Sequence, residues 1–177
     1  TNHLKRRFAY STVSNLSYIL LAVTLMSGSG LAAAAMHMVS HAFVKIALFF
    51  CVGAALEREG AEYLDQIEGI GRRMPVTFGC FVVASAALIG LPPLPVFFSK
   101  WAIGEAAMGL SSGWAYTVLA ALLVSTTLTA LYTLSIAVRA FFPLGEAPAK
   151  AQPRTETRSM TTAIVIVTVC IVALGFT

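Results

Sequence analysis

The sequence predicts an all-α fold, a polytopic transmembrane helical bundle, and three observations indicate this class. Of the 177 residues, 58% are hydrophobic and only 11% are charged, whereas soluble domains carry about 25% charged residues. The mean hydropathy is +0.81. Several stretches also approach the length of about 20 apolar residues that one helix needs to cross a bilayer. We therefore expect a multi-pass protein of a bacterial or archaeal inner (plasma) membrane.

About six spans are predicted within one transmembrane domain, 1–177. The expected helical segments are residues 9–26, 31–56, 75–90, 92–108, 113–142 and 161–176. The third and fourth segments are short, and they meet at Pro92, Pro93 and Pro95. Prolines remove backbone donors and forbid a continuous helix, so this region is predicted to be a proline-broken helix.

Two polar loops, 57–74 and 143–160, separate these segments, and the first holds five of the eight acidic residues. Six crossings would place the Lys5 end and loop 57–74 on one side of the membrane, with loop 143–160 on the other. The first side has more basic residues by a small margin, which favours it as cytoplasmic. Charge alone leaves the orientation open.

Composition also excludes several function classes. The net charge is +4, but the basic residues flank apolar segments, as in membrane proteins, and no nucleic-acid surface is indicated. Cys51, Cys80 and Cys170 lie far apart inside apolar runs, a spacing that fits neither a disulfide framework nor a metal site. We therefore expect no metal, no cofactor, no catalytic residues and no enzymatic activity of the chain's own.

Ionisable residues interrupt the second segment. His37, His41 and Lys45 are spaced at i, i+4 and i+8, so they form a stripe about 12 Å long on one helix face. A charge at the centre of a membrane helix costs about 2.5–3.5 kcal/mol, and imidazole can donate and accept a proton near neutral pH. The stripe therefore predicts a proton relay, with Ser40 as an auxiliary residue that holds a bridging water. The alternative is that these side chains only hydrogen-bond across helices.

A second charged position follows the prolines. Lys100 lies five residues after Pro95, with Ser99 beside it and Glu105 further along. A charge beside an interrupted membrane helix is typical of ion sites in transporters. The alternative is that Lys100 extends to the membrane interface with Trp101 as its aromatic anchor. Ser99 and Glu105 are predicted as auxiliary residues.

Four motifs occur in a characteristic order. They are Leu-Lys-Arg-Arg-Phe-Ala-Tyr-Ser-Thr-Val-Ser at 4–14, the His37/His41/Lys45 helix, Gly-Arg-Arg-Met-Pro at 71–75, and Gly-Leu-Pro-Pro at 90–93 followed by Ser99-Lys100. In this order the chain resembles the antiporter-like proton-translocating subunits shared by Mrp-type cation/proton antiporters, complex I and membrane-bound hydrogenases. Within that family it is most similar to the D-type subunits of the Mrp antiporters.

The resemblance implies a specific architecture and specific roles. The chain would be the C-terminal part of a longer subunit, the second inverted-repeat half of a fourteen-span fold. Lys5 would link two half-channels, His37, His41 and Lys45 would form the central relay, and Lys100 would be the terminal lysine on the broken helix. Loop 57–74 would face outward. His3 stands where the family commonly has an aspartate.

The function that the resemblance implies is proton translocation within a multi-subunit monovalent cation/proton antiporter. The expected partners are other membrane subunits, the lipid bilayer, protons, and sodium or potassium ions. One alternative is a proton-pumping subunit of a redox-driven complex, similar to complex I or a membrane-bound hydrogenase. Another is a structural membrane subunit without transport of its own.

Overall fold

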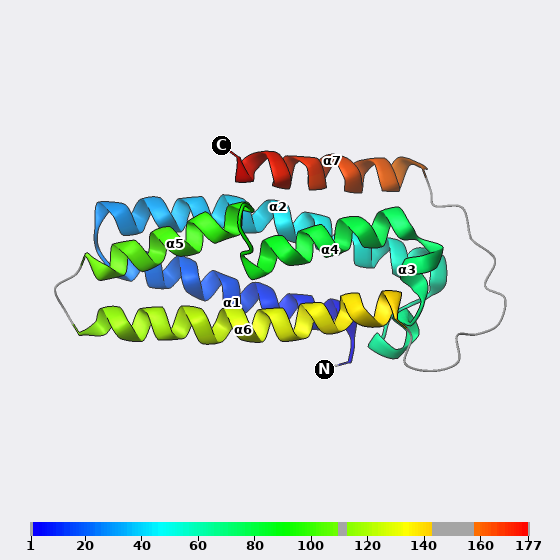
Figure 1. Cartoon of the computed structure of the whole chain (residues 1–177), viewed down its shortest axis with the longest axis horizontal. Helices are drawn as coiled ribbons and strands as arrows, with labels where there is room; N and C mark the ends of the chain where they lie inside the picture. Colours follow the sequence, from blue (N-terminus) through cyan, green and yellow to red (C-terminus); the bar gives the residue numbers. More distant parts are fainter. Residues whose placement is uncertain (1, 110–112, 143–157, 177) are drawn as a thin grey trace.

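The computed structural model describes residues 2–109, 113–142 and 158–176, which form a bundle of long helices running along one common axis (Figure 1). Each of the six expected segments corresponds to one of the longer helices, although the ends differ by up to five residues. In chain order the elements are α1 (Leu4–Thr24), α2 (Gly28–Glu59), the short 3₁₀ helix η1 (Leu64–Ile67), α3 (Ile70–Arg73), α4 (Pro75–Ile89), α5 (Pro95–Met108), α6 (Trp114–Phe141) and α7 (Arg158–Gly175).

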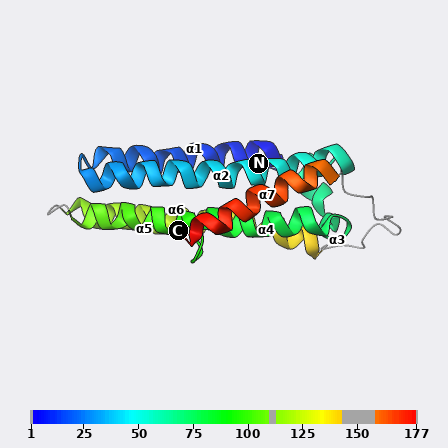
Figure 2. The same ribbon diagram turned by 90° about the horizontal axis from the view of Figure 1, so that it is seen from above.

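The helices form two layers with one helix lying across them. Helices α1 and α2 pack side by side as one layer, and α4, α5 and α6 form the other (Figure 2). Helix α7 crosses obliquely and packs against α2, α4 and α5. Helix α2 therefore lies at the centre, because it contacts α1, α4, α5 and α7.

The turn between α1 and α2 is tight, and this sets the position of α2. The Ser27 side chain caps α2 by accepting a hydrogen bond from the backbone N–H of Gly30 at 3.0 Å. A Cβ atom at Gly30 would lie 2.6 Å from the carbonyl oxygen of Ala22, so only glycine allows this approach. The helix ends at Gly60, whose φ of 64° lies in the left-handed region that favours glycine.

The proline-rich segment divides one membrane crossing into two half-helices. Helix α4 has 15 residues and α5 has 14, which gives lengths of about 22 Å and 21 Å. Each is shorter than a bilayer core of about 30 Å. The two helices lie end to end, with the break near the middle of the bundle (Figure 1). They therefore cross the membrane together, as one interrupted element and not as two spans.

This arrangement changes the predicted topology. The C-terminal turn of α6 lies at the same end of the bundle as loop 57–74, because the Gly69 amide donates to the carbonyl of Arg139 at 3.3 Å and the Arg139 guanidinium lies 3.8 Å from the Glu68 carboxylate. Six crossings would place the end of α6 opposite loop 57–74, and that expectation was wrong, since residues 75–108 cross once. Residues 158–160 form the first turn of α7, and 143–157 lie outside the described residues.

Three helices of the described part, α2, α6 and α7, are each long and apolar enough to cross a membrane unaided. By length and composition alone the bent pair Leu64–Arg73 and Pro75–Ile89 would count as a fourth, but α4 continues in line with α5 and crosses the membrane with that helix. Helix α1 has 21 residues and packs along α2 with Leu4 and Phe8 in the main hydrophobic core. Its first turn carries Lys5, Arg6 and Arg7.

Candidate proton-transfer site

The three ionisable residues of α2 all point into the bundle. Relative exposures are 0% for His37, 5% for His41 and 6% for Lys45. The four-residue spacing places them on one face of α2, which packs against α1 and α5. The two imidazole rings stack with 6.0 Å between centroids and an interplanar angle of 10°. The predicted stripe is therefore a buried column of side chains.

Helix α5 joins this column beside the helix break. The Ser99 hydroxyl lies 2.8 Å from His37 Nδ1 and also donates to the Val96 carbonyl at 3.0 Å. Ser99 is fully buried, and Lys100 follows it in sequence. The structure thus brings the two charged positions together, although 55 or more residues separate them in the chain.

Lys100 binds the broken helix itself. Its Nζ donates to the carbonyl of Ile89 in the last turn of α4 at 2.9 Å, and to the Thr126 hydroxyl of α6 at 3.0 Å. The same ammonium lies 5.5 Å from the ring centroid of Tyr18. The end of α4 therefore supplies a carbonyl partner at membrane depth, where an interrupted helix leaves such groups available.

Lys45 occupies the other end of the column. Its Nζ donates to the carbonyl of Phe8 in α1 at 2.9 Å and lies 5.4 Å from the Phe8 ring centroid. Both Lys45 and Lys100 lie close enough to His41 to interact with it electrostatically. A positive charge on one lysine is therefore felt at the histidine between them.

The histidines retain hydrogen-bonding capacity that the described residues do not use. His37 Nε2 and both ring nitrogens of His41 are buried, and none has a hydrogen-bond partner in the described part of the chain. A buried polar atom without a partner costs about 1–3 kcal/mol, and ordered water commonly fills this role. The arrangement therefore suits water molecules that connect the side chains.

A cavity opens beside Lys100 between α5 and α6. Its volume is about 710 Å³, and its walls include Phe97, Trp101, Glu105 and Leu122. Of the predicted auxiliary residues, Glu105 is exposed on α5 and lines this cavity. Ser99 instead contacts the column. The Ser40 hydroxyl donates to the Met36 carbonyl of its own helix at 2.8 Å, not to a histidine.

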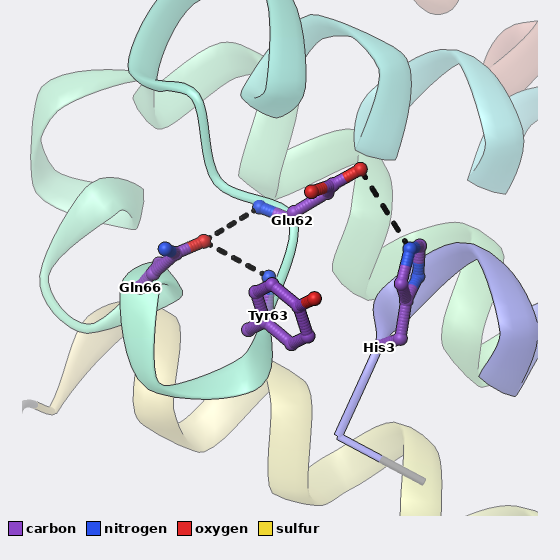
Figure 3. A network of polar contacts seen from close by, with 4 residues as sticks. All are labelled: His3, Glu62, Tyr63 and Gln66. Carbon is purple, nitrogen blue, oxygen red and sulfur yellow. Dashed lines mark hydrogen bonds and ion pairs between the residues drawn. The ribbon is translucent and has the colours of Figure 1, made fainter.

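Lys5 does not join the column. It is exposed in the first turn of α1, three residues before the Phe8 carbonyl that Lys45 binds. His3, which takes the place of the aspartate expected from the family, interacts instead with loop 57–74: its Nε2 lies 3.7 Å from the Glu62 carboxylate (Figure 3).

The contacts of His3 belong to a clamp between the start of α1 and that loop. The Leu4 amide donates to the Glu62 carbonyl at 3.0 Å. The Gln66 side chain accepts from the amides of Glu62 and Tyr63 at 2.8 and 3.0 Å (Figure 3). The clamp fixes the N-terminal turn of α1, and with it the carbonyl that binds Lys45.

Sequence reasoning missed the groups that surround the two lysines. Tyr18, Thr126 and the Phe8 carbonyl contact them, yet neither a tyrosine or threonine in an apolar helix nor a main-chain oxygen stands out by residue type. No group of three or more His, Cys, Asp or Glu residues that could hold a metal ion occurs within 2–109, 113–142 and 158–176.

Comparisons with known proteins identify a family and several sequence relatives of this chain. The family model described as the transmembrane region of NADH:quinone oxidoreductase and Mrp antiporters matches residues 1–142. NADH-quinone oxidoreductase subunit N of Desulforudis audaxviator is 38% identical over 138 residues, covering 78% of this chain and 27% of that protein. NAD(P)H-quinone oxidoreductase chain 4 1 of Synechococcus elongatus is 34% identical over 160 residues, covering 86% and 30%. The chain thus spans less than a third of the length of these relatives.

Solved structures show the same fold. The chain matches the Mrp complex from Dietzia sp. with a TM-score of 0.86 and 25% identity, covering 99% of this chain and 40% of that one. It matches the membrane-bound sulfane sulfur reductase, an archaeal respiratory membrane complex, with a TM-score of 0.87 and 27% identity, covering 99% and 34%. The predicted helical fold and the predicted resemblance are confirmed. The finer likeness to the D-type Mrp subunits stays a prediction, because the matched sequence relatives bear quinone oxidoreductase names.

Proposed function

Since this multi-pass inner-membrane chain belongs to the NADH:quinone oxidoreductase/Mrp antiporter transmembrane family, and so is an antiporter-like subunit of Mrp-like or complex I-like membrane complexes, we propose that it translocates protons through its buried Lys/His column. The observation that carries this proposal is the continuity of the column: Lys100 and Ser99 at the broken helix, His37 against Ser99, His41 stacked on His37, and Lys45 at the far end.

The column has the chemistry that proton transfer needs. Imidazole accepts a proton on one nitrogen and releases one from the other, and each histidine keeps a ring nitrogen available for water. A lysine in a low-dielectric interior interacts strongly with neighbouring charges, so a proton that arrives at Lys100 changes the energy of protonating His37 and His41, and a proton on Lys45 does the same at His41. We propose that this coupling moves protons stepwise along the column.

The direct test is proton flux in vesicles containing the assembled complex with the full-length subunit. We expect Lys100→Ala and His41→Ala each to lower the flux at least about tenfold, because each removes a proton-carrying group. Ser40→Ala is the matched control on the same helix, since that hydroxyl bonds only to its own helix. Unchanged flux in both variants would instead favour a structural subunit without transport.

The role of Lys5 is a separate proposal. Its exposed position at the start of α1 suits a link to groups beyond the described residues, such as the first half-channel that the family resemblance implies. Under this proposal Lys5→Ala lowers the flux as Lys100→Ala does, whereas the neighbouring exposed Arg6→Ala leaves it unchanged.

The assembly that uses this column has two candidates. The Dietzia structure is of an Mrp complex, and on that analogy the chain works with other membrane subunits as part of a monovalent cation/proton antiporter. Sodium or potassium gradients imposed on inverted vesicles would then drive proton movement without any electron donor.

The second candidate, a redox-driven complex, has equal support. The matched sequence relatives are quinone oxidoreductase subunits, and the sulfane sulfur reductase is a respiratory complex. In that case the chain is a non-catalytic membrane subunit, and proton movement requires an electron donor and acceptor whatever the cation gradient. Measuring proton flux with each driving force alone separates the two candidates.

The structure also supports an orientation for the bundle. Eight basic residues lie at one end of the described helices. The described residues at the other end, 24–28, 105–109 and 113–114, include no lysine or arginine. The eight are Lys5, Arg6, Arg7, Arg58, Arg72, Arg73, Arg139 and Arg158. Short segments rich in Lys and Arg face the cytoplasm. We therefore propose that the end carrying loop 57–74 is cytoplasmic, the reverse of the orientation implied by the family resemblance.

A further inference from the structure

A second set of buried polar residues lies between α1 and α6, apart from the column on α2. Helix α1 buries Ser11, Asn15 and Tyr18 at relative exposures of 5%, 2% and 5%. Their spacing of four and three residues places them on one face. Helix α6 presents hydroxyl groups with the same spacing: Ser125, Thr129 and Tyr132. In a membrane, two facing polar stripes are costly unless they hydrogen-bond to each other or to water.

Contacts across the two helices link the stripes at the basic end of the bundle. The Ser11 hydroxyl hydrogen-bonds with the Tyr132 hydroxyl of α6, whereas Asn15 Nδ2 donates within α1 to the Ser11 carbonyl at 2.8 Å. One turn further along, Arg7 Nη1 donates to the Ser135 hydroxyl at 3.2 Å. We call Ser11, Asn15, Tyr18, Ser125, Thr129 and Tyr132 the α1–α6 polar stripe.

The other end of the stripe meets Lys100. The Lys100 ammonium donates to Thr126, the neighbour of Ser125, and lies over the Tyr18 ring. The Tyr18 hydroxyl faces Ser125 and Thr126 without a direct hydrogen bond to them. Lys100 therefore lies where the stripe and the α2 column meet.

The length and the unfilled hydrogen-bonding capacity of the stripe both point to water. Tyr18 and Arg7 are 11 residues apart on α1, which is about 16 Å along the helix, or about half of the bilayer core. Asn15 Oδ1 and the Tyr18 hydroxyl are buried, and neither has a hydrogen-bond partner within the described ranges. The backbones of α1 and α6 do not pack closely against each other, as those of α1 and α2 do, so side chains and the spaces between them fill this interface.

We propose that the α1–α6 polar stripe holds a file of water molecules that gives Lys100 proton access to the Arg7 end of the bundle. This path runs from Lys100 along α1 and α6 and not along the His37–His41–Lys45 column, with which it shares the edge-on contact between the Tyr18 and His37 rings, 5.5 Å between centroids. The inference rests on the proposed proton-translocating function. The stripe supplies the exchange route to the aqueous surface, and the α2 column carries protons within the membrane.

Proton flux in vesicles with the assembled complex tests the branch. Asn15→Leu, Tyr132→Phe and Thr129→Val each replace a polar atom of the stripe with a similar volume. We expect the flux to fall about tenfold or more in each, at unchanged amounts of subunit in the purified complex. Thr127→Val on the exposed face of α6 is the matched control and should leave the flux unchanged.

The outcomes distinguish this inference from the function on which it rests. If Lys100→Ala stops the flux while the three stripe variants behave like Thr127→Val, the branch is refuted and the proposed function stands. If Lys100→Ala and His41→Ala leave the flux unchanged, both proposals fail.

Thiol labelling tests the presence of water directly and does not depend on transport. In a complex whose native cysteines have been replaced, Asn15→Cys should react with a small, charged, membrane-impermeant methanethiosulfonate. Ala22→Cys, fully buried in an apolar cluster on the same helix, is the control and should stay unreactive. Equal protection of both cysteines would overturn the water file even if the stripe variants lowered the flux.

Discussion

Ser99→Ala tests the junction between the broken helix and the histidines most directly. The Ser99 hydroxyl is the direct hydrogen-bond link from α5 to His37. Its removal leaves His37, which is 0% exposed, with an unpaired Nδ1, and a buried polar atom without a partner costs about 1–3 kcal/mol. The other hydrogen bond of Ser99, to the Val96 carbonyl, is local to α5. We therefore expect the substitution to change mainly the orientation and the tautomer of the His37 ring.

The expected effect on transport follows from the same contact. Removing a positioned proton-transfer partner typically slows a reaction about 10²–10⁴-fold. A water molecule can partly replace a single hydroxyl, so we expect a proton flux about 10- to 100-fold lower in Ser99→Ala. The assay is the initial rate of vesicle acidification, normalised to the amount of subunit in the complex.

Ser85→Ala provides a matched control in the other half-helix. Ser85 is 2% exposed in α4, and its hydroxyl has no hydrogen-bond partner among the described residues. Removing it should leave both flux and assembly unchanged. If Ser99→Ala and Ser85→Ala gave equal flux, the Ser99–His37 contact would not belong to the proton path, and the junction between α5 and the column would have to lie elsewhere.

Three further predictions concern other parts of the bundle. Lys45→Met keeps the volume but removes the charge and the bond to the Phe8 carbonyl, so proton flux should fall about tenfold or more while assembly persists; flux equal to wild type would remove Lys45 from the path. Gly90→Ala places a side chain at φ +91° and 3.4 Å from the Lys100 side chain, and thermal denaturation of the complex should show a loss of about 1–2 kcal/mol. For orientation, Glu62→Cys should react with impermeant thiol reagents only from the cytoplasmic face and Ser29→Cys only from the opposite face, and the reverse pattern would refute the charge argument.

The column was predictable because ionisable residues are rare in membrane helices. In an apolar helix, two histidines and a lysine at four-residue spacing are conspicuous, and helical geometry fixes their common face. The contact between this stripe and Ser99 was not predictable from spacing, since it depends on how α5 packs against α2.

The polar stripe between α1 and α6 did have a signal in the sequence. Ser11, Asn15 and Tyr18 repeat at helical spacing within the first segment, as charged residues do in the second. Hydroxyl and amide side chains cost less in a membrane than charges do, so their presence in a membrane helix indicates a functional site less strongly than a charged residue does.

The topology depended on geometry that residue types do not encode. Three prolines predict where a helix breaks, but not whether the two halves turn back on each other or continue in line. Their lengths of 15 and 14 residues were the available evidence, since neither half alone reaches across a bilayer.

The helix break also brings opposite ends of two dipoles into the middle of the membrane. The C-terminal end of a helix carries about half a negative charge, and the end of α4 presents the Ile89 carbonyl to the Lys100 ammonium. This attraction exists only while Lys100 holds its proton. When the proton leaves, the end of α4 loses its counter-charge and the hydrogen bond between the Ile89 carbonyl and the ammonium group weakens. The charge of one side chain is thereby tied to the electrostatic balance of the interrupted helix at the middle of the membrane.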